Sequence, residues 1–261
     1  MKKFLIIVFA ALLSVCAYSQ TEVSVRVMSM NLKEGGKPGN YDVAKYAAVI
    51  NDYKPDFVSL QELHDRTLMV LGKAWLAELG KRVGMYPVVF DSFDYNGGTF
   101  GVGILSRYPF YSMGKVVYNS GLAEQREPRA TGWVSVMLPD GGNVRFAATH
   151  LPVENNDLRV KCIAAINKEI FAENSVIPTI IAGDFNAEPG SDVMKYAGNR
   201  WKEINPGAGN TLPAGDNPKQ QYDFVLGYPK TGWSCSMYEI LNRADLSDHC
   251  FVVADVNYKE K

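Results

Sequence analysis

Hydrophobic and polar positions follow two different periods along the chain. Ten short segments carry apolar side chains in continuous runs or at alternate positions, a pattern that predicts β-strands. They are 23–30, 57–61, 87–90, 102–106, 133–138, 144–149, 177–182, 222–226, 233–240 and 251–256. Three segments repeat apolar side chains every three to four residues and predict helices at 43–53, 67–83 and 158–171. Many strands with few helices predict two sheets packed face to face with helices outside.

A turn signal joins two of the predicted strands. The sequence Pro-Asp-Gly-Gly at 139–142 separates segments 133–138 and 144–149. Residues of this kind are typical of hairpin loops, because glycine and aspartate accept the backbone angles of a tight turn. We therefore expect these two strands to be antiparallel neighbours.

The N-terminus has the pattern of an export signal. A basic start precedes an apolar run at 4–13, which is too short to span a bilayer, and small residues follow at Ala17 and Ser19. We expect residues 1–19 to be a signal peptide and residues 20–261 to be a single exported domain, periplasmic or extracellular. No later stretch predicts a membrane helix, so we expect no stable insertion into a membrane.

The cysteines leave two questions open. Cys16 offers an alternative in which the exported protein is anchored through a lipidated cysteine, although Val15 stands where such a signal has a small side chain. Cys162, Cys235 and Cys250 remain after cleavage at residue 19, and they lack metal-ligand spacing. A disulfide between Cys235 and Cys250 and a set of three buried thiols both fit an exported protein.

Charge limits the classes of partner. The chain has 27 basic and 28 acidic residues. Removal of the signal takes away Lys2 and Lys3 and no acid, so 25 basic residues face 28 acidic ones, a net charge of −3. Proteins that bind duplex nucleic acid without sequence preference gain most of their affinity from basic side chains. A mildly acidic chain lacks that general bias, and we expect a monomer whose substrate is a small molecule or a locally bound nucleic acid.

Polar side chains stand at the ends of several predicted strands. Asn31 and Glu62 close two strands near the N-terminus, Asp184 follows a buried run, and Asp248 precedes the last strand. Buried polar groups of this kind are costly unless they are paired or bind something. Carboxylate and amide oxygens are the ligands of hard divalent cations. The sequence predicts a site for Mg²⁺, with Mn²⁺ as the alternative, and its lack of a Cys/His cluster argues against structural zinc.

Two of the three histidines lie at the same strand ends. His150 closes the strand 144–149, and His249 lies just before the last strand. Imidazole titrates near neutrality, so each is a candidate general acid or base. Asp223 is an acid among apolar neighbours, which is the setting of a carboxylate that orients an imidazole. His64 has no such company, and we assign it to the surface.

Seven short motifs along the chain occur in the same order as in a known family of enzymes. The chain resembles the endonuclease/exonuclease/phosphatase superfamily of metal-dependent phosphoesterases. The resemblance implies a deoxyribonuclease I-like fold, a four-layer αββα sandwich of two mixed, mostly antiparallel sheets flanked by helices, with the site at one end of the sheets. The motifs are Met30-Asn31-Leu32, Leu60-Gln61-Glu62, Gly103-Ile104-Leu105-Ser106-Arg107-Tyr108-Pro109, Thr149-His150-Leu151, Gly183-Asp184-Phe185-Asn186, Tyr222-Asp223-Phe224 and Ser247-Asp248-His249.

The resemblance also implies roles at the matching positions. Glu62 is similar to the principal metal carboxylate of the family, with Asn31 nearby and Asp248 bound directly or through water. Asp184 resembles the residue that orients or deprotonates the attacking water. Asn186 would hold that water or a phosphate oxygen.

The remaining matches concern the phosphate group. His249, oriented by Asp223, would stabilise the transition state or act as general acid or base, and His150 would donate to a phosphate oxygen. Arg126 resembles an arginine that meets the substrate backbone in secreted deoxyribonucleases, and Arg129 resembles one from another branch. Both are candidate phosphate contacts.

These features predict an exported, divalent-metal-dependent phosphoesterase in which an activated water attacks a phosphodiester or phosphomonoester. A secreted nuclease acting on DNA or RNA is the alternative. A third hypothesis, a non-catalytic protein that binds a phosphate ligand, predicts loss of Glu62, Asp184, Asp223 or His249, and all four are present. The sequence leaves the substrate open.

Overall fold

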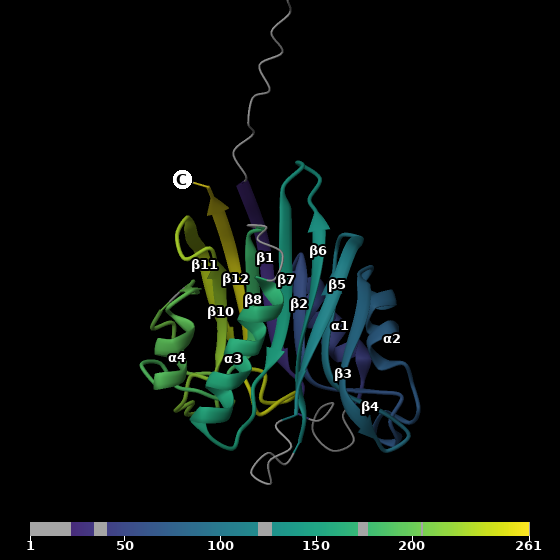
Figure 1. Cartoon of the computed structure of the whole chain (residues 1–261). Coiled ribbons are helices and arrows are strands. Elements are labelled where there is room, and N and C mark those ends of the chain that lie inside the picture. The colour runs from purple at the N-terminus through teal and green to yellow at the C-terminus, as the bar shows by residue number, and fades with distance from the viewer. Residues whose placement is uncertain (1–21, 34–40, 120–126, 172–176, 205, 261) are drawn as a thin grey trace, which may run out of the picture.

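Two sheets form the centre of the protein (Figure 1). The computed structural model describes residues 22–33, 41–119, 127–171, 177–204 and 206–260. Within these residues, each sheet has six strands. The predicted signal peptide 1–19, Cys16 and Arg126 lie outside the described residues.

The first sheet contains one parallel pair. Strands β1 and β2 run parallel, and every other neighbouring pair in this sheet is antiparallel. In spatial order the strands are β11 (Trp233–Leu241), β12 (Phe251–Lys259), β1 (Glu22–Asn31), β2 (Phe57–Asp65), β4 (Gly98–Ser106) and β3 (Tyr86–Tyr95).

The second sheet repeats this plan. Strands β7 and β8 are its parallel pair, and its other pairs are antiparallel. The hairpin predicted at 139–142 is present, since Met137 of β6 pairs with Asn143 of β7. In spatial order the strands are β5 (Phe110–Tyr118), β6 (Arg129–Met137), β7 (Asn143–His150), β8 (Thr179–Asp184), β10 (Asp223–Tyr228) and β9 (Lys202–Glu203).

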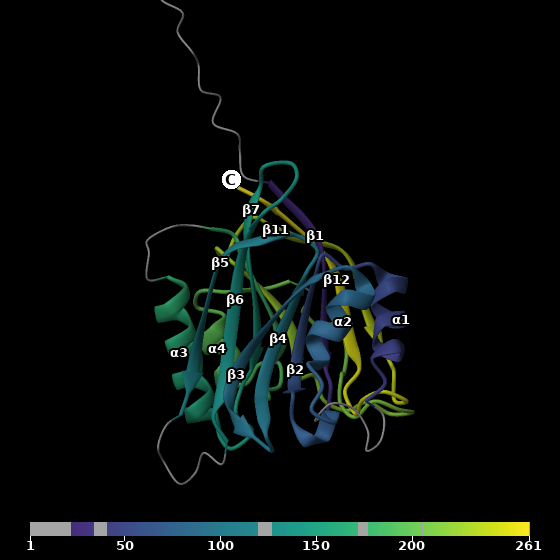
Figure 2. The same cartoon turned by 90° about the vertical axis from the view of Figure 1, so that its right-hand side faces the viewer.

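Helices cover the outer face of each sheet (Figure 2). Helices α1 (Val43–Tyr53) and α2 (Trp75–Val83) pack on the first sheet, and α3 (Asn156–Ile170) and α4 (Asp192–Ala197) pack on the second. The order helix, sheet, sheet, helix confirms the predicted αββα sandwich. No helix among the described residues has the length and apolar character needed to cross a membrane.

Three apolar layers hold the four structural layers together. The central layer lies between the sheets, where the rings of Phe57 and Phe146 stack with their centroids 5.0 Å apart. A second layer lies under α1 and α2, where Tyr46 meets Trp75 edge to face. The third lies under α3 and α4. Burial of apolar area on this scale is the main favourable contribution to folding.

The structure divides one predicted helix and contains three elements that the sequence did not predict. The helix expected at 67–83 is a short 3₁₀ helix η1 (Leu68–Val70) followed by α2, because Leu71 and Gly72 adopt left-handed backbone angles that end a helix. Strands β5 and β9 and helix α4 were not expected. Strand β5 places apolar side chains on its exposed face and has Ser112 and Gly114 on the other, so it lacks a continuous apolar face.

The three cysteines within the described part of the chain are free thiols. A Cys235–Cys250 disulfide is wrong because the two residues lie toward opposite ends of an antiparallel pair. Cys235 pairs with Val256, whereas Cys250 precedes Phe251, which pairs with Leu241. Six residues of strand separate the positions by roughly 20 Å, far beyond the reach of a disulfide. Cys162 and Cys250 are buried as the thiol alternative expects, and Cys235 is half-buried.

Candidate active site

The strand directions bring the predicted polar residues to one end of the sandwich. Parallel β1 and β2 both end there, as do parallel β7 and β8. Strand β12 is antiparallel to β1, and β10 is antiparallel to β8, so both begin at that same end. The C-terminus lies at the opposite end of the molecule (Figure 1). Residues that are between 31 and 215 positions apart in the sequence therefore become neighbours.

Asp184 is the centre of the cluster. It is the last residue of β8 and only 1% exposed. The Asn31 side-chain amide donates to its Oδ2 at 3.1 Å, and the backbone N–H of Asn186 donates to its Oδ1 at 2.8 Å. Nε2 of His150 lies 3.6 Å from the same Oδ2, and Nε2 of His249 lies 3.8 Å from it. Four predicted residues thus surround one buried carboxylate.

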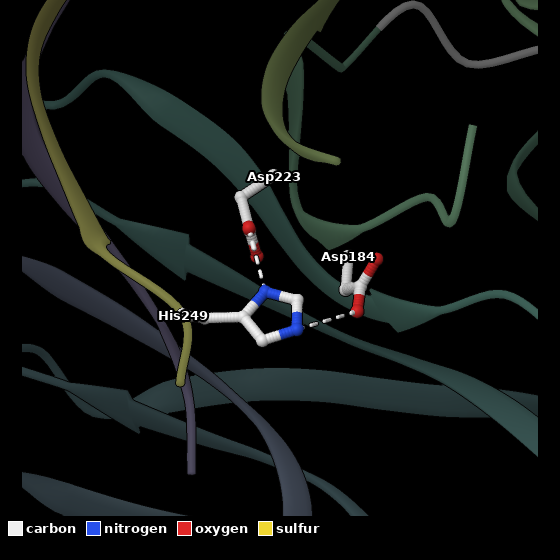
Figure 3. Close-up of side chains that lie close together, drawn as sticks. All are labelled: Asp184, Asp223 and His249. Carbon is white, nitrogen blue, oxygen red and sulfur yellow. Dashed lines mark hydrogen bonds and ion pairs between the residues drawn. The ribbon is translucent and has the colours of Figure 1, made fainter. Parts of the chain in front are cut away.

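Asp223 and His249 form a hydrogen-bonded pair beside it (Figure 3). Nδ1 of His249 lies 2.9 Å from Oδ2 of Asp223, so the other ring nitrogen points toward Asp184. The side-chain oxygen of Thr211 accepts hydrogen bonds from the backbone N–H groups of Tyr222 and Asp223. This contact fixes the start of β10 and, with it, the carboxylate that orients the imidazole.

Burial and charge shift the pKa values of these groups in different directions. Burial, helped by the negative charge of Asp223, raises the pKa of Asp184 to about 7. Burial alone would lower the pKa of His249, but the carboxylates of Asp223 and Asp184 outweigh it and raise that pKa to about 10. Burial, with the positive charges of Arg129 and His249, lowers the pKa of His150 well below 6.5. The site therefore holds one charged and one neutral imidazole at neutral pH.

Asn186 is held by its backbone and its side chain. It adopts a left-handed φ of 47°, a conformation that asparagine tolerates better than most residues. Its side-chain Nδ2 donates to the carbonyl of Leu151 at 2.9 Å, which turns the side-chain oxygen in a fixed direction. The amide can therefore accept a hydrogen bond from a water molecule.

A bulge in β2 places Glu62. The pairing of β2 with β4 shifts register between Leu60 and Leu63, and Glu62 has a left-handed φ of 54°. Strand β2 thus continues to Asp65 rather than ending at Gln61 as expected. Bulges re-aim side chains, and Glu62 is half-exposed between buried neighbours. Nδ2 of Asn31 donates to its Oε1 at 3.2 Å.

Asp248 has a different contact from the other predicted metal ligands. Its Oδ2 accepts a hydrogen bond from Nζ of Lys33 at 2.5 Å, and its side chain is about one-third exposed. Lys33 follows Asn31 closely, and its backbone N–H donates to Oδ1 of Asn31. The lysine links the two predicted ligands and was not foreseen, because a single exposed lysine carries no sequence signal.

The donor set fits a hard divalent cation. The carboxylates of Glu62 and Asp184 lie on either side of the Asn31 side chain, whose Nδ2 donates to an oxygen of each. Among the described residues, the ligand atoms of Asp184, Asp223 and His249 also lie within 4.8 Å of one another. The raised pKa of Asp184 reflects burial together with the nearby charges of Asp223 and Glu62. A cation would relieve that excess of negative charge.

His64 corrects an expectation. We assigned it to the surface, but it is 2% exposed and its ring packs against Tyr95 and Phe100. Oγ1 of Thr67 lies 3.2 Å from its Nδ1. His64 follows the bulge at Glu62, which breaks the alternation of faces along β2, so the sequence pattern did not reveal its burial. Burial lowers its pKa, so the ring is neutral at pH 7.

Arg129 lies near Glu62 but inside the protein. It is the first residue of β6, it is buried, and its Nη1 donates to Glu127 at 2.8 Å. Its guanidinium lies 5.8 Å from the centroid of the Phe100 ring. Arg126, the other predicted phosphate contact, is outside the described residues.

Sequence comparison places the chain in a family. The model of the endonuclease/exonuclease/phosphatase family matches residues 28–258. The chain belongs to this family. Its members are hydrolases that act on phosphate esters, which agrees with the resemblance carried by the seven motifs. None of the curated protein sequences matches the chain.

Solved structures share the fold at low sequence identity. An endonuclease/exonuclease/phosphatase from Bacteroides vulgatus is 17% identical, with a TM-score of 0.74 over 90% of this chain and 98% of that one. A mannosyl-6-phosphatase from Bacteroides thetaiotaomicron is 16% identical, with a TM-score of 0.71 over 89% and 99%. The human Nocturnin catalytic domain with bound sulfate is 18% identical, with a TM-score of 0.67 over 92% and 97%. At these identities the likeness concerns the fold.

Proposed function

We propose that the protein is an exported, divalent-metal-dependent phosphoesterase that hydrolyses a phosphodiester or phosphomonoester by attack of an activated water. The main observation that supports the proposal is the set of side chains around Asp184. This buried carboxylate contacts Asn31 and two histidines, one of which is paired with Asp223. Export rests on the predicted signal peptide, which would leave Gln20 at the N-terminus.

In this mechanism Asp184 and Asn186 orient and activate the attacking water. A carboxylate with a pKa of about 7 is a suitable base near neutral pH, because it accepts a proton readily and releases it again. The Asn186 backbone already donates to the same carboxylate, so its side chain stands within reach of a water bound there. Together they orient the water for attack on phosphorus.

The histidines and arginines are proposed to bind the oxygens of the phosphate group. His249 carries a positive charge stabilised by Asp223, so it can donate to an oxygen that gains negative charge in the transition state. His150 is neutral and donates a hydrogen bond to a second phosphate oxygen without adding charge. Arg129 and Arg126 are proposed as further phosphate contacts.

The metal ligands in this proposal are Glu62, Asn31 and Asp248. Mg²⁺ is the proposed ion, with Mn²⁺ as the alternative. A bound divalent ion polarises a phosphoryl oxygen and offsets the charge of the transition state. Lys33 would leave Asp248 or share it when the site is filled, because its ammonium neutralises that carboxylate in the structure.

The proposal is tested by activity of purified residues 20–261. We expect hydrolysis of at least one phosphate ester among sugar phosphates, inositol phosphates, sphingomyelin, RNA and DNA, with Mg²⁺ required and EDTA abolishing the reaction. The name of the mannosyl-6-phosphatase supports including phosphomonoesters of sugars. Absence of hydrolysis for all of them, with Mg²⁺ or Mn²⁺ present, would contradict the proposal. Cleavage of DNA or RNA alone would favour the nuclease alternative.

A further inference from the structure

A cavity lies next to the proposed site and shares Glu62 and Arg129 with it, while the rest of its lining has no role in the steps above. The space inside it that water molecules can occupy is about 90 Å³. Glu62 forms one side, where the cavity meets the proposed site, and His64, Phe100 and Arg129 line the interior. The walls come from four strands, β2, β3, β4 and β6, so the cavity has a rigid frame.

Two buried nitrogen atoms on side chains that line this cavity have no hydrogen-bond partner among the described residues. They are Nε2 of His64 and Nε of Arg129. The remaining polar atoms of these side chains are better supplied, since Nδ1 of His64 lies 3.2 Å from Thr67 Oγ1 and Nη1 of Arg129 donates to Glu127. Buried polar atoms without partners are costly, and they occur mainly where a water, an ion or a ligand supplies the partner.

Aromatic rings form the opposite wall. The ring centroids of His64 and Phe100 lie 5.1 Å apart, those of Phe93 and Phe100 lie 5.4 Å apart, and those of Phe93 and Tyr95 lie 6.0 Å apart. Tyr95 is 42% exposed. A ring with an apolar face can therefore pack that face against these rings while its edge reaches the polar atoms.

The charged side chains of the lining indicate which kind of ring the cavity would bind. Glu62 and Glu127 bring two carboxylates, which repel a second phosphate and accept hydrogen bonds from hydroxyl groups. His64 and Arg129 bring the nitrogens described above. A hydrocarbon chain would leave the nitrogens of His64 and Arg129 without partners. A ring that carries hydroxyl groups both donates and accepts at each position, so it can bond these nitrogens and also donate to the carboxylates.

We propose that this cavity binds the sugar ring of a sugar phosphate ester, with His64 as a residue that determines specificity. The inference rests on the proposed phosphoesterase function and adds the substrate class. The phosphate lies at Glu62 and Asp184, and the ring extends from it into the cavity, where a ring hydroxyl bonds Nε2 of His64 and the ring face packs on Tyr95.

The test compares two monoesters with the same phosphate group. Hexose 6-phosphate carries a hydroxylated ring, and phenyl phosphate carries a flat ring without hydroxyls. For the wild type with Mg²⁺ we expect kcat/KM to be higher for the hexose phosphate. His64→Phe keeps an aromatic ring and removes Nε2, so we expect the ratio of the two kcat/KM values to fall at least tenfold, mainly through KM for the sugar phosphate. An unchanged ratio would overturn the proposal.

Matched variants separate specificity from folding. Tyr111→Phe changes an exposed aromatic on β5, away from the cavity, and should leave the ratio unchanged. If His64→Phe does not fold, Tyr95→Leu replaces it, because Tyr95 is partly exposed; we expect it to raise KM for hexose 6-phosphate several-fold. A wild type that prefers nucleotides or phospholipid headgroups over the sugar phosphate would also overturn the proposal.

A binding measurement keeps the inference separate from the catalytic proposal. Asp184→Asn is titrated with hexose 6-phosphate and Mg²⁺, and the imidazole NMR signals of His64 are followed. We expect those signals to shift with saturation. If the wild type hydrolyses no ester but the His64 signals shift, the proposed function fails and the cavity assignment holds. If esters are hydrolysed and the His64 signals do not respond, the cavity assignment fails alone.

Discussion

Asp184 is an example of a site residue whose burial costs folding stability and gives it a pKa suited to catalysis. Its carboxylate is buried among Asp223, Glu62 and two histidines, and burial raises its pKa to about 7. A raised pKa means that ionisation of this group is more costly in the folded chain than in the unfolded chain. Such a residue is expected where a protein needs a base near neutral pH rather than a stabilising ion pair.

Replacing Asp184 by asparagine should therefore separate activity from stability. Asp184→Asn removes the proposed base, so we expect kcat to fall by about 1,000-fold or more. Folded Asp184 binds a proton up to about pH 7, whereas the unfolded residue loses it near pH 4. In wild type this group lowers the free energy of unfolding as pH rises between those values, and the variant should lack that decline. Urea unfolding in EDTA from pH 4.5 to 7.5 measures the difference.

The matched control is Asp192→Asn. Asp192 is an exposed carboxylate in the first turn of α4, paired with Lys195 at the surface. We expect activity within a factor of two of wild type and the wild-type dependence of stability on pH. Full activity of Asp184→Asn, with the protein folded, would remove Asp184 from the mechanism.

At the level of elements, the site depends on how closely β7 and β8 approach. Gly183, one residue before Asp184, has a φ of 154°, and a Cβ placed on it would lie 2.0 Å from the backbone oxygen of Thr149. These two residues are paired in the parallel register that also aligns His150 with Asp184. The glycine thus permits the strand contact that sets the His150–Asp184 distance.

Adding one methyl group at this position should disturb both the strand pair and the site. For Gly183→Ala we expect a loss of about 3 kcal/mol in the free energy of unfolding, because backbone atoms must move apart. Displacement of Asp184 from His150 should also lower kcat by roughly 100-fold. Denaturant unfolding and steady-state kinetics measure the two effects.

Gly198→Ala is the comparison for that substitution. Gly198 follows α4 with a φ of −61°, which alanine adopts, and its nearest contact would be 3.2 Å. We expect a change within about 1 kcal/mol and unaltered kinetics. A Gly183→Ala variant as stable and active as Gly198→Ala would show that the strand pair does not position the site.

At the level of the whole molecule, the apolar layer between the sheets holds the two halves of the site together. The first sheet supplies Asn31 and Glu62, and His249 lies just before its strand β12. The second sheet supplies Asp184 and Asp223. Packing between the sheets therefore determines whether the halves meet.

The stacked pair Phe57–Phe146 tests this dependence. Both rings are fully buried between the sheets. We expect Phe146→Ala to lower the free energy of unfolding by about 3–5 kcal/mol, through lost burial and a residual cavity. Tyr111→Ala, on the exposed side of β5, should change it by less than about 0.5 kcal/mol. Urea unfolding measures the free energy of unfolding of both variants. Equal values would mean that the central apolar layer is not what holds the two sheets together.

The sequence predicted most of the elements and the fold class because the spacing of apolar residues within a short segment already indicates a helix or a strand. Helix α1 has the bounds that its period predicts. The prediction failed where local backbone or an edge position overrode the pattern. Left-handed angles at Leu71 and Gly72 divided one expected helix, and β5 has Tyr111, Met113 and Val117 on its exposed face.

The sequence by itself determined which side chains the site could use, since Asn31, Glu62, Asp184, Asp223 and His249 stand in motifs at predicted strand ends. Only the tertiary structure decided their partners. The contact of His249 with both Asp223 and Asp184, the bulge that re-aims Glu62, the lysine at Asp248 and the burial of His64 all depend on distances between strands. Periodicity reports which face of a strand a residue occupies, whereas contacts across two sheets arise only when the chain is packed.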